Sequence, residues 1–261
     1  MRFQDVTQRL TTPLDAPAYA RGPYRFTDRE YFTITYRTDP HVLERFVPEP
    51  LRVAEPTVRF EVIRMPDTTG LGDYAESGQV LSVEYEGERG EYVLAMYVDS
   101  LPAITSGREI SAYPKKLGAP RLMVDSDTLV GTLDYGSLRV ATATMGYKHA
   151  PLDADQAREE ICCPTFMVKK LPGYTGDPRI CELVRFQIED ITVKGSWTGP
   201  ARLQLFQHAL APMADLPVLE VLSASHILTD LTLPPPPPPP RSSTTTSPGE
   251  VRGAHHDEEP S

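Results

Sequence analysis

The sequence predicts a mainly β fold with few helices, either an antiparallel barrel or a sandwich. Short segments rich in β-branched and aromatic residues recur along the chain, turns containing glycine separate many of them, and only two segments carry helix signals. The 261 residues are 40% hydrophobic, which is enough for one large domain or two small ones with a buried core.

Nine segments have the composition of strands. They cover residues 31–37, 57–65, 80–86, 91–99, 128–135, 138–147, 182–193, 201–208 and 220–229. Glycines between neighbouring segments predict two hairpin turns, one at 87–90 and one at Gly136-Ser137. Short strands joined in this way form barrels or sandwiches, and barrels of this size often enclose a ligand cavity.

Two helices are predicted from capping signals. Asp39 and Pro40 begin the first, whose apolar face runs from 42 to 47 and ends before a proline. Asp153 begins the second, which continues to Cys162.

Proline is unusually frequent, at 27 residues, and seven of these form an unbroken run from Pro234 to Pro240. The 21 residues that follow contain one valine and no leucine, isoleucine or aromatic residue, so they bury too little apolar surface to offset their ordering entropy. We therefore expect a folded domain over residues 1–233 and a polyproline II rod with a disordered tail over residues 234–261. Docking of the proline run on an SH3, WW or EVH1 groove is the alternative to a solvated extension.

Charge and composition exclude several classes of protein. Asp and Glu number 36 against 26 Lys and Arg, so a net charge of −10 argues against general nucleic-acid binding. The longest apolar run is seven residues, which is too short for a membrane span, and the N-terminus has no apolar signal segment. Three cysteines, two of them adjacent, argue against a disulfide framework and favour a reduced, cytoplasmic protein.

Most catalytic patterns are absent. The single histidines at 41, 149, 208 and 226 form no metal-ligand spacing, and the sequence has neither a phosphate-binding glycine loop nor a Gly-x-Ser-x-Gly elbow. The pair Cys162-Cys163 lies at the end of a predicted helix, where a thiolate is not stabilised, so we interpret it as small core residues.

Two lysine pairs remain, Lys115-Lys116 and Lys169-Lys170, each with apolar neighbours. A lysine moved into an apolar cavity has a lowered pKa, and its neutral amine can attack a carbonyl to form a Schiff base. Spacing alone does not rank the two pairs, and solvated surface lysines are the alternative for both.

A family resemblance ranks them. Residues 108–121 resemble the lysine signature of the acetoacetate decarboxylase family, and Arg29, Glu61 and Glu76 lie at matching positions. Residues 197–203 and 225–228 are also similar, so the resemblance covers about residues 1–233. It implies a closed antiparallel β-cone around a cavity, a small β-keto acid substrate and a large homo-oligomer. It also implies decarboxylation of acetoacetate to acetone and CO₂ with neither a metal nor an organic cofactor.

The resemblance also implies roles for individual residues. Lys115 is expected to form the Schiff base, Lys116 to be its cationic neighbour, and Arg29, Glu61 and Glu76 to be polar groups of the active site. We expect Arg29 to pair with Glu61 or Glu76, because an unpaired carboxylate beside Lys115 would stabilise its ammonium form.

Extended backbone would place Lys115 and Lys116 on opposite faces of their strand. Desolvation is then expected to exceed the effect of the Lys116 charge on Lys115. Tyr113, two residues earlier, would share the face of Lys115 and contribute to substrate binding. Met96 is a candidate apolar neighbour, with ordinary core packing as the alternative.

Two other functions remain possible on this sequence. One is a Schiff-base aldolase or dehydratase of the same fold acting on a larger keto acid. The other is a non-catalytic barrel that carries small hydrophobic acids. The lysine alone does not distinguish them.

Truncation of the chain after Leu233 should leave kcat and KM unchanged, because every expected active-site residue precedes position 120. Steady-state kinetics and gel filtration of the truncated protein test this. Loss of activity together with dissociation of an oligomer would show that the proline-rich extension is structural.

Overall fold

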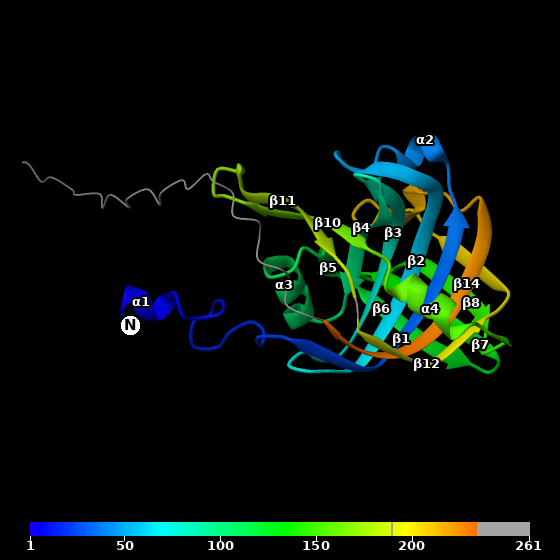
Figure 1. The fold of residues 1–261 in the computed structure, drawn as a ribbon, viewed down its shortest axis with the longest axis horizontal. Coiled ribbons are helices and arrows are strands. Elements are labelled where there is room, and N and C mark those ends of the chain that lie inside the picture. The colour runs from blue at the N-terminus through cyan, green and yellow to red at the C-terminus, as the bar shows by residue number, and fades with distance from the viewer. Residues whose placement is uncertain (189, 234–261) are drawn as a thin grey trace, which may run out of the picture.

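The computed structural model describes residues 1–188 and 190–233, so the predicted polyproline segment and tail lie outside the described residues. The mainly β prediction is confirmed: the described residues form two sheets and four short α-helices (Figure 1). The large sheet has the strand order β11-β10-β4-β3-β2-β1-β14-β12-β9, with β5 paired to β4. The small sheet has the order β13-β8-β7-β6.

The strands of the large sheet are β1 (Tyr24–Arg37), β2 (Arg52–Thr68), β3 (Gly72–Tyr85), β4 (Glu88–Val98), β5 (Lys115–Leu117), β9 (Ala150–Pro151), β10 (Thr165–Pro172), β11 (Pro178–Phe186), β12 (Ile191–Thr198) and β14 (Glu220–Leu233). Those of the small sheet are β6 (Ala119–Asp125), β7 (Thr128–Tyr135), β8 (Leu138–Gly146) and β13 (Ala201–Leu205). The pairing is antiparallel except where β4 meets β5 and β10.

Chain segments that pass directly from one sheet to the other hold the two sheets together. Only Gly118 separates β5 from β6, and only Gly199-Pro200 separates β12 from β13. A Cβ at Gly118 would lie 2.7 Å from the Tyr97 side chain, so this crossing needs glycine. The segment that contains Lys115 and Lys116 is therefore attached on one side to the large sheet and on the other to the small sheet.

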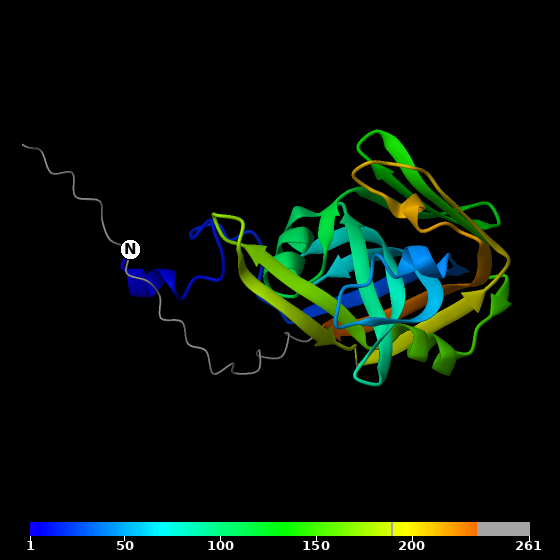
Figure 2. The same cartoon turned by 90° about the horizontal axis from the view of Figure 1, so that it is seen from above.

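Each face of the large sheet packs against a separate apolar cluster. Alternate residues of β2, such as Phe60 and Val62, pack with Leu129 and Leu133 of the small sheet. On the opposite face, Ile63 packs with residues of α3 (Leu101–Glu109), α4 (Ala154–Ile161), β10 and β14. The large sheet curls around this second cluster, which holds the functional site described below (Figures 1 and 2).

The helix predictions are partly confirmed. Asp153 caps α4 by accepting hydrogen bonds from the backbone amides of residues 155 and 156. The helix that begins at Pro40 is α2 (Pro40–Leu43), which ends sooner than the predicted 47. Helix α3 was not predicted, although Ser100 caps it and a proline occupies its first turn. The fourth helix, α1 (Phe3–Val6), was not predicted either.

One strand prediction was wrong. The segment 182–193 is not one strand, because β11 ends at Phe186 at one edge of the large sheet and β12 begins at Ile191 near the opposite edge. The strands β5, β6, β9 and β10 were not predicted. The first hairpin turn is at Glu86-Gly87, where both residues have positive φ, rather than at 87–90. The second hairpin turn is at Gly136-Ser137 as predicted.

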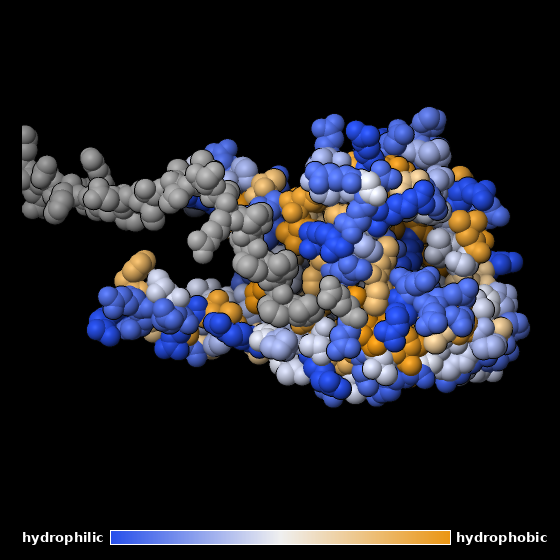
Figure 3. Space-filling model, viewed as in Figure 1, coloured by the Kyte–Doolittle hydropathy of each residue, from blue (hydrophilic) through white to orange (hydrophobic). Residues whose placement is uncertain are grey.

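The N-terminal segment and the β10–β11 hairpin extend from the same end of the molecule (Figures 1 and 2). Both carry exposed aromatic side chains, Phe3 and Tyr174. Polar and charged side chains cover much of the face seen in Figure 3, with apolar groups between them. Among the described residues, no helix has the length and apolar character that a membrane span requires.

Candidate active site

Lys115 is a buried lysine at the start of a very short strand. It is the first residue of β5 and pairs with Met96 of β4, and its side chain is only 7% exposed. The side chain of Lys116 lies on the opposite face of β5, where its Nζ donates a hydrogen bond of 2.6 Å to the Leu210 carbonyl. The predicted alternation of the two lysines is therefore confirmed, and only the first reaches the cavity.

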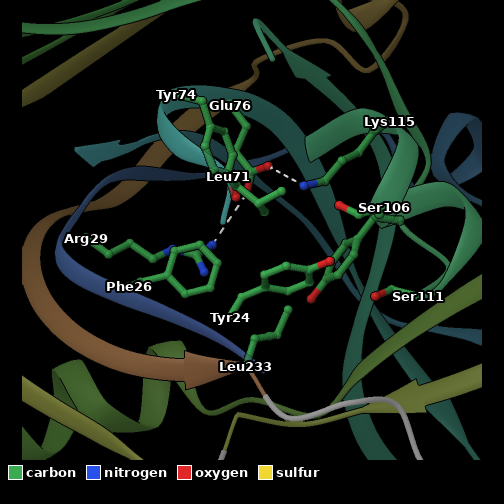
Figure 4. Close-up of a pocket in the computed structure, with 12 residues that line it drawn as sticks. Tyr24, Phe26, Arg29, Leu71, Tyr74, Glu76, Ser106, Ser111, Lys115 and Leu233 are labelled. Carbon is green, nitrogen blue, oxygen red and sulfur yellow. Dashed lines mark hydrogen bonds and ion pairs between the residues drawn. The ribbon is translucent and has the colours of Figure 1, made fainter. Parts of the chain in front are cut away.

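Glu76 lies between two cationic groups (Figure 4). Its Oε2 is 2.9 Å from the Lys115 Nζ, and its Oε1 accepts a hydrogen bond of 3.4 Å from the Arg29 Nη2. The approach of Lys115 to Oε2 has the distance of an ion pair but not the alignment of a hydrogen bond. One carboxylate thus partners both cations, and all three residues are less than 10% exposed.

The Glu76 carboxylate lies between the Lys115 amine and the Arg29 guanidinium. Arg29 partly neutralises the negative charge of the Glu76 carboxylate. Although burial lowers the pKa of Arg29, the nearby Tyr31 and Glu76 raise it more, so Arg29 stays charged. The expectation that Arg29 pairs with Glu61 or Glu76 is met by Glu76.

Aromatic rings surround the amine. The Lys115 Nζ lies 5.2 Å from the centre of the Tyr113 ring and 5.7 Å from that of Tyr74. Burial is the main reason that the pKa of each of these phenols is raised, so both stay protonated at neutral pH. Tyr113 therefore has the position that the sequence predicted for it.

Helix α3 covers the lysine side chain from above. A Cβ added at Gly107 would lie 2.8 Å from Cδ and 3.1 Å from Cε of Lys115, so this glycine leaves room for the lysine. Arg108, the next residue, donates a hydrogen bond of 3.2 Å from Nη1 to the Lys115 carbonyl. Glycine inside a helix lowers stability by about 1 kcal/mol relative to alanine. We infer that Gly107 is present because Lys115 needs the space that a methyl group would fill.

The cavity in front of Lys115 is small, about 30 Å³, and is lined by residues of β1, β3, α3 and the end of β14 (Figure 4). Its lining comprises Tyr24, Phe26, Arg29, Leu71, Tyr74, Glu76, Ser106, Gly107, Ser111, Tyr113, Lys115 and Leu233. This size suits a small substrate, since one water needs about 10–15 Å³ by the same kind of measure.

Three of the residues expected in the site are not in this lining. Lys116 lies on the other side of β5, as described above. Met96 is 5% exposed and packs in the core beside Lys115, so its side chain belongs to the wall behind the lining residues. Glu61 is buried on the same face of the sheet, but its partner is Arg59 rather than Arg29.

A second buried polar cluster surrounds Arg59. Its Nε donates to Oε1 of Glu61 at 2.8 Å and its Nη2 to Oε2 of Glu91 at 2.5 Å. Its Nη1 donates to the backbone carbonyl of Glu160 at 3.2 Å. Burial raises the pKa of Glu91 to about 7, because the attraction of Arg59 does not offset the burial and the repulsion from Glu61 and Glu160.

The cysteines and the second lysine pair have other environments. Cys162 and Cys163 are partly buried free thiols whose pKa values are raised, mainly by burial, and that for Cys163 is about 11. Both thiols therefore stay protonated near pH 7, which agrees with the prediction that these cysteines are packing residues rather than reactive thiolates. The Lys169 Nζ donates to the Ile110 carbonyl at 2.9 Å, just after α3 ends, and does not enter the cavity lining. The described residues contain no group of three or more His, Cys, Asp or Glu suited to a metal ion.

Comparison with known proteins agrees with this geometry. The family model for acetoacetate decarboxylase matches residues 11–237. The chain belongs to the acetoacetate decarboxylase family. An acetoacetate decarboxylase of Streptomyces nogalater is 72% identical over 233 residues, which are 89% of this chain and 96% of that one. An acetoacetate decarboxylase of Clostridium acetobutylicum is 60% identical over 234 residues, covering 90% and 96% of the two chains.

Solved structures of acetoacetate decarboxylase have the same fold. One superposes with a TM-score of 0.88 at 60% identity, covering 90% of this chain and 96% of its own. That from Legionella pneumophila superposes with a TM-score of 0.85 at 47% identity, covering 89% and 92%. The enduracididine biosynthesis enzyme MppR, at 22% identity and a TM-score of 0.72, shares the fold alone.

Several residues of the site escaped the sequence reasoning. Tyr24, Tyr74 and Ser106 line the cavity, and Arg59 partners Glu61. Tyr74 lies two residues before Glu76 in a strand, so alternation alone would have placed it on the same face. Ser106 and Gly107 required recognition of α3, for which the Ser100 cap and the following proline were the available signals.

Substitution of Gly107 by alanine should lower kcat by about tenfold without lowering the Tm. The new methyl group displaces the Lys115 side chain, and small misplacements of a reacting group are costly. Alanine also favours the helix, so stability is expected to be kept or raised. Steady-state kinetics and thermal unfolding test this, with Thr105→Ala on the same helix as the control. Unchanged kcat in Gly107→Ala would contradict the role assigned to this glycine.

Substitution of Glu91 by glutamine should change how stability depends on pH. The unfolded chain ionises this residue near 4.5, whereas the folded chain holds the proton up to about 7. The free energy of unfolding therefore falls by up to about 3 kcal/mol as pH rises between these values. A glutamine does not ionise, so the variant does not undergo this fall. The Tm of Glu91→Gln should rise relative to that of the unsubstituted protein from pH 4.5 to pH 7. The exposed Glu55→Gln variant is the control, and a pH-independent difference for Glu91→Gln would contradict the assignment.

Proposed function

We propose that this protein decarboxylates acetoacetate to acetone and CO₂ through a Schiff base on Lys115. The observation that carries the proposal is the buried Lys115 amine, 2.9 Å from a Glu76 carboxylate that also pairs with Arg29. The family membership and the 72% identity to an acetoacetate decarboxylase support the same reaction.

The reaction begins at the ketone carbon. The neutral Lys115 amine attacks it and forms a C–N bond, and the carbonyl oxygen takes up a proton to give a carbinolamine. A second proton lets this oxygen leave as water and produces a protonated imine. The bond to the carboxylate then breaks, CO₂ departs, and its electron pair moves to the imine nitrogen to form an enamine. The enamine takes a proton on carbon, and water hydrolyses the resulting imine to acetone and free lysine.

Arg29 is suited to bind the carboxylate of the substrate. Its Nε is buried and has no hydrogen-bond partner among the described residues, and only its Nη2 contacts Glu76. A buried donor without a partner is costly, so an entering carboxylate would satisfy it. The same contact would hold the ketone carbon toward Lys115, which raises the rate by orientation.

Glu76 is suited to transfer the protons. It lies beside the Lys115 amine, and an incoming substrate carboxylate on Arg29 would repel its negative charge. That repulsion favours uptake of a proton by Glu76, which the departing carbinolamine oxygen can then accept. Substrate binding would thus prepare Glu76 to donate a proton.

Lys116 and Glu61 have less direct places in this scheme. The Lys116 ammonium donates to the Leu210 carbonyl on the far face of β5, so its charge acts on Lys115 only through space. Glu61 is paired with Arg59 and does not line the cavity. Tyr113 and Met96 complete the apolar surroundings of the amine.

We also propose that residues 1–233 form one catalytic domain that assembles as a large homo-oligomer in the cytoplasm. The family match over residues 11–237 supports the domain. The exposed Phe3 and Tyr174, on two segments that extend from one end of the molecule, support assembly.

A larger keto acid, as in an aldolase or dehydratase, is less well supported. The cavity of about 30 Å³ suits a small substrate, and MppR, named with pyruvate and a condensation product of pyruvate, shares the fold alone. A non-catalytic carrier would not need a buried amine beside a carboxylate shared by two cations.

The deciding experiment is chemical trapping. The protein is incubated with acetoacetate, reduced with borohydride, digested and mapped by mass spectrometry. An adduct of the size expected for the acetone imine on Lys115 supports the mechanism. Absence of any covalent adduct would favour the carrier, and an adduct without CO₂ release would favour the aldolase or dehydratase.

Substitution of Lys115 by alanine should abolish CO₂ release, whereas Lys169→Ala should retain most of it. Lys169 is the matched control because it is also partly buried, but its Nζ binds the Ile110 carbonyl and not the cavity. CO₂ release from acetoacetate measures both variants. A fully active Lys115→Ala protein would refute the mechanism.

A further inference from the structure

Arg59 ties together three elements of the fold behind the cavity. Each of its guanidinium nitrogens has a different partner: Glu61 on its own strand, Glu91 on β4 and the backbone carbonyl of Glu160 on α4. The Glu160 carboxylate in turn accepts a hydrogen bond of 2.7 Å from Oγ of Ser225 on β14. A side chain held by three elements has little freedom, so Glu61 is fixed with it.

The cluster contains more negative than positive charge. The carboxylates of Glu61 and Glu91 pair with the single guanidinium of Arg59, and the nearby Glu160 carboxyl group acts on it only through space. The other ionisable groups that face the cluster are Tyr31, Tyr113 and Cys163, whose pKa values are all raised and which are therefore neutral near pH 7. Burial raises the pKa of Glu91 to about 7, so below that pH the cluster retains a proton there and Arg59 is left to neutralise Glu61.

Glu61 lies in the same row of the sheet as Lys115. The register pairs Glu61 with Gly78, Gly78 with Met96, and Met96 with Lys115, so all four residues face the same side. The β4 backbone approaches Gly78 closely, since a Cβ there would lie 2.4 Å from the Ala95 carbonyl oxygen. A Glu61 carboxylate that Arg59 did not neutralise would place a second negative charge on the face of the sheet that holds the amine.

A second free carboxylate near Lys115 would oppose the chemistry. Glu76 already favours the ammonium form, and another negative charge in the same low-dielectric region would add to this. The neutral amine needed for attack would then form only at higher pH.

We propose that Arg59 is a positioning residue that holds and neutralises Glu61, so that Glu76 is the one carboxylate acting on the Lys115 amine. Glu91 and the Glu160 carbonyl anchor Arg59 for this task. The proposal rests on the Schiff-base function proposed above. It assigns separate arginines to the two carboxylates, Arg29 to Glu76 and Arg59 to Glu61.

The test measures the acid limb of kcat/KM against pH, which reports the essential groups of the free enzyme. Removal of Arg59 alone would leave the buried carboxylates of both Glu61 and Glu91 unpaired. The Glu91→Gln variant is therefore the reference protein into which the other substitutions are introduced. Relative to Glu91→Gln, the Arg59→Met/Glu91→Gln double variant should have its acid limb about one pH unit higher, which is a roughly tenfold loss of kcat/KM on that limb. Adding Glu61→Gln should return the acid limb to that of the background.

Two single variants test the proposal without disturbing Arg59. Glu76→Gln should move the acid limb to lower pH, because it removes the carboxylate that acts on the amine. Glu61→Gln should leave the limb in place, whatever its effect on kcat, because Arg59 already neutralises that charge. Equal shifts in both variants would overturn the proposal.

The remaining outcomes are equally decisive. An unmoved acid limb in a folded Arg59→Met/Glu91→Gln protein, or a triple variant that does not return, would overturn the proposal. Circular dichroism and a cooperative thermal transition establish folding, and if the double variant does not fold, the two single variants decide. Borohydride trapping in the unsubstituted protein distinguishes failure of the proposed function from failure of the role of Arg59. If no adduct forms on Lys115, the Schiff-base function is refuted. If the adduct forms but the pH shifts do not occur, only the role of Arg59 is refuted.

Discussion

The contact on which the site depends is that of one buried carboxylate with two cations. Glu76 approaches the Lys115 amine at 2.9 Å and the Arg29 guanidinium at 3.4 Å in surroundings from which water is largely excluded. A lone carboxylate there would hold Lys115 as an ammonium, and a lone lysine would have no group to exchange protons with. Sharing Glu76 with Arg29 keeps the carboxylate present while weakening its hold on the amine.

The β-sheet fixes the relative positions of these three side chains. Glu76 and Arg29 lie on long strands in the middle of the large sheet, whereas Lys115 begins a strand of three residues at its side. That short strand is fixed by parallel pairing to β4, by the crossing at Gly118 and by the hydrogen bond from Arg108. Rigid strands therefore carry Arg29 and Glu76, while a helix with a glycine at the point of contact covers the Lys115 side chain.

Two arginine–carboxylate sets lie in the interior on one face of the large sheet. The set nearer the cavity, Arg29 with Glu76, includes an arginine nitrogen that has no hydrogen-bond partner among the described residues. The set behind it, Arg59 with Glu61 and Glu91, has all its guanidinium nitrogens engaged. An unsatisfied donor suits ligand binding and a satisfied cluster suits support, because only the first gains a hydrogen bond when the ligand arrives.

The sequence alone determined the fold class, the two hairpins that it located near 87 and 136, the α4 cap at Asp153 and the alternation of Lys115 with Lys116. These depend on local backbone preferences that neighbouring residues set. Family resemblance, rather than spacing, selected Lys115 over Lys169. The partner of each acid was decided only by the tertiary structure, because Arg29 with Glu76 and Arg59 with Glu91 come together through strand register across tens of residues. The same holds for Gly107, whose importance comes from a lysine side chain that the chain brings against α3 only after it has turned back along β4.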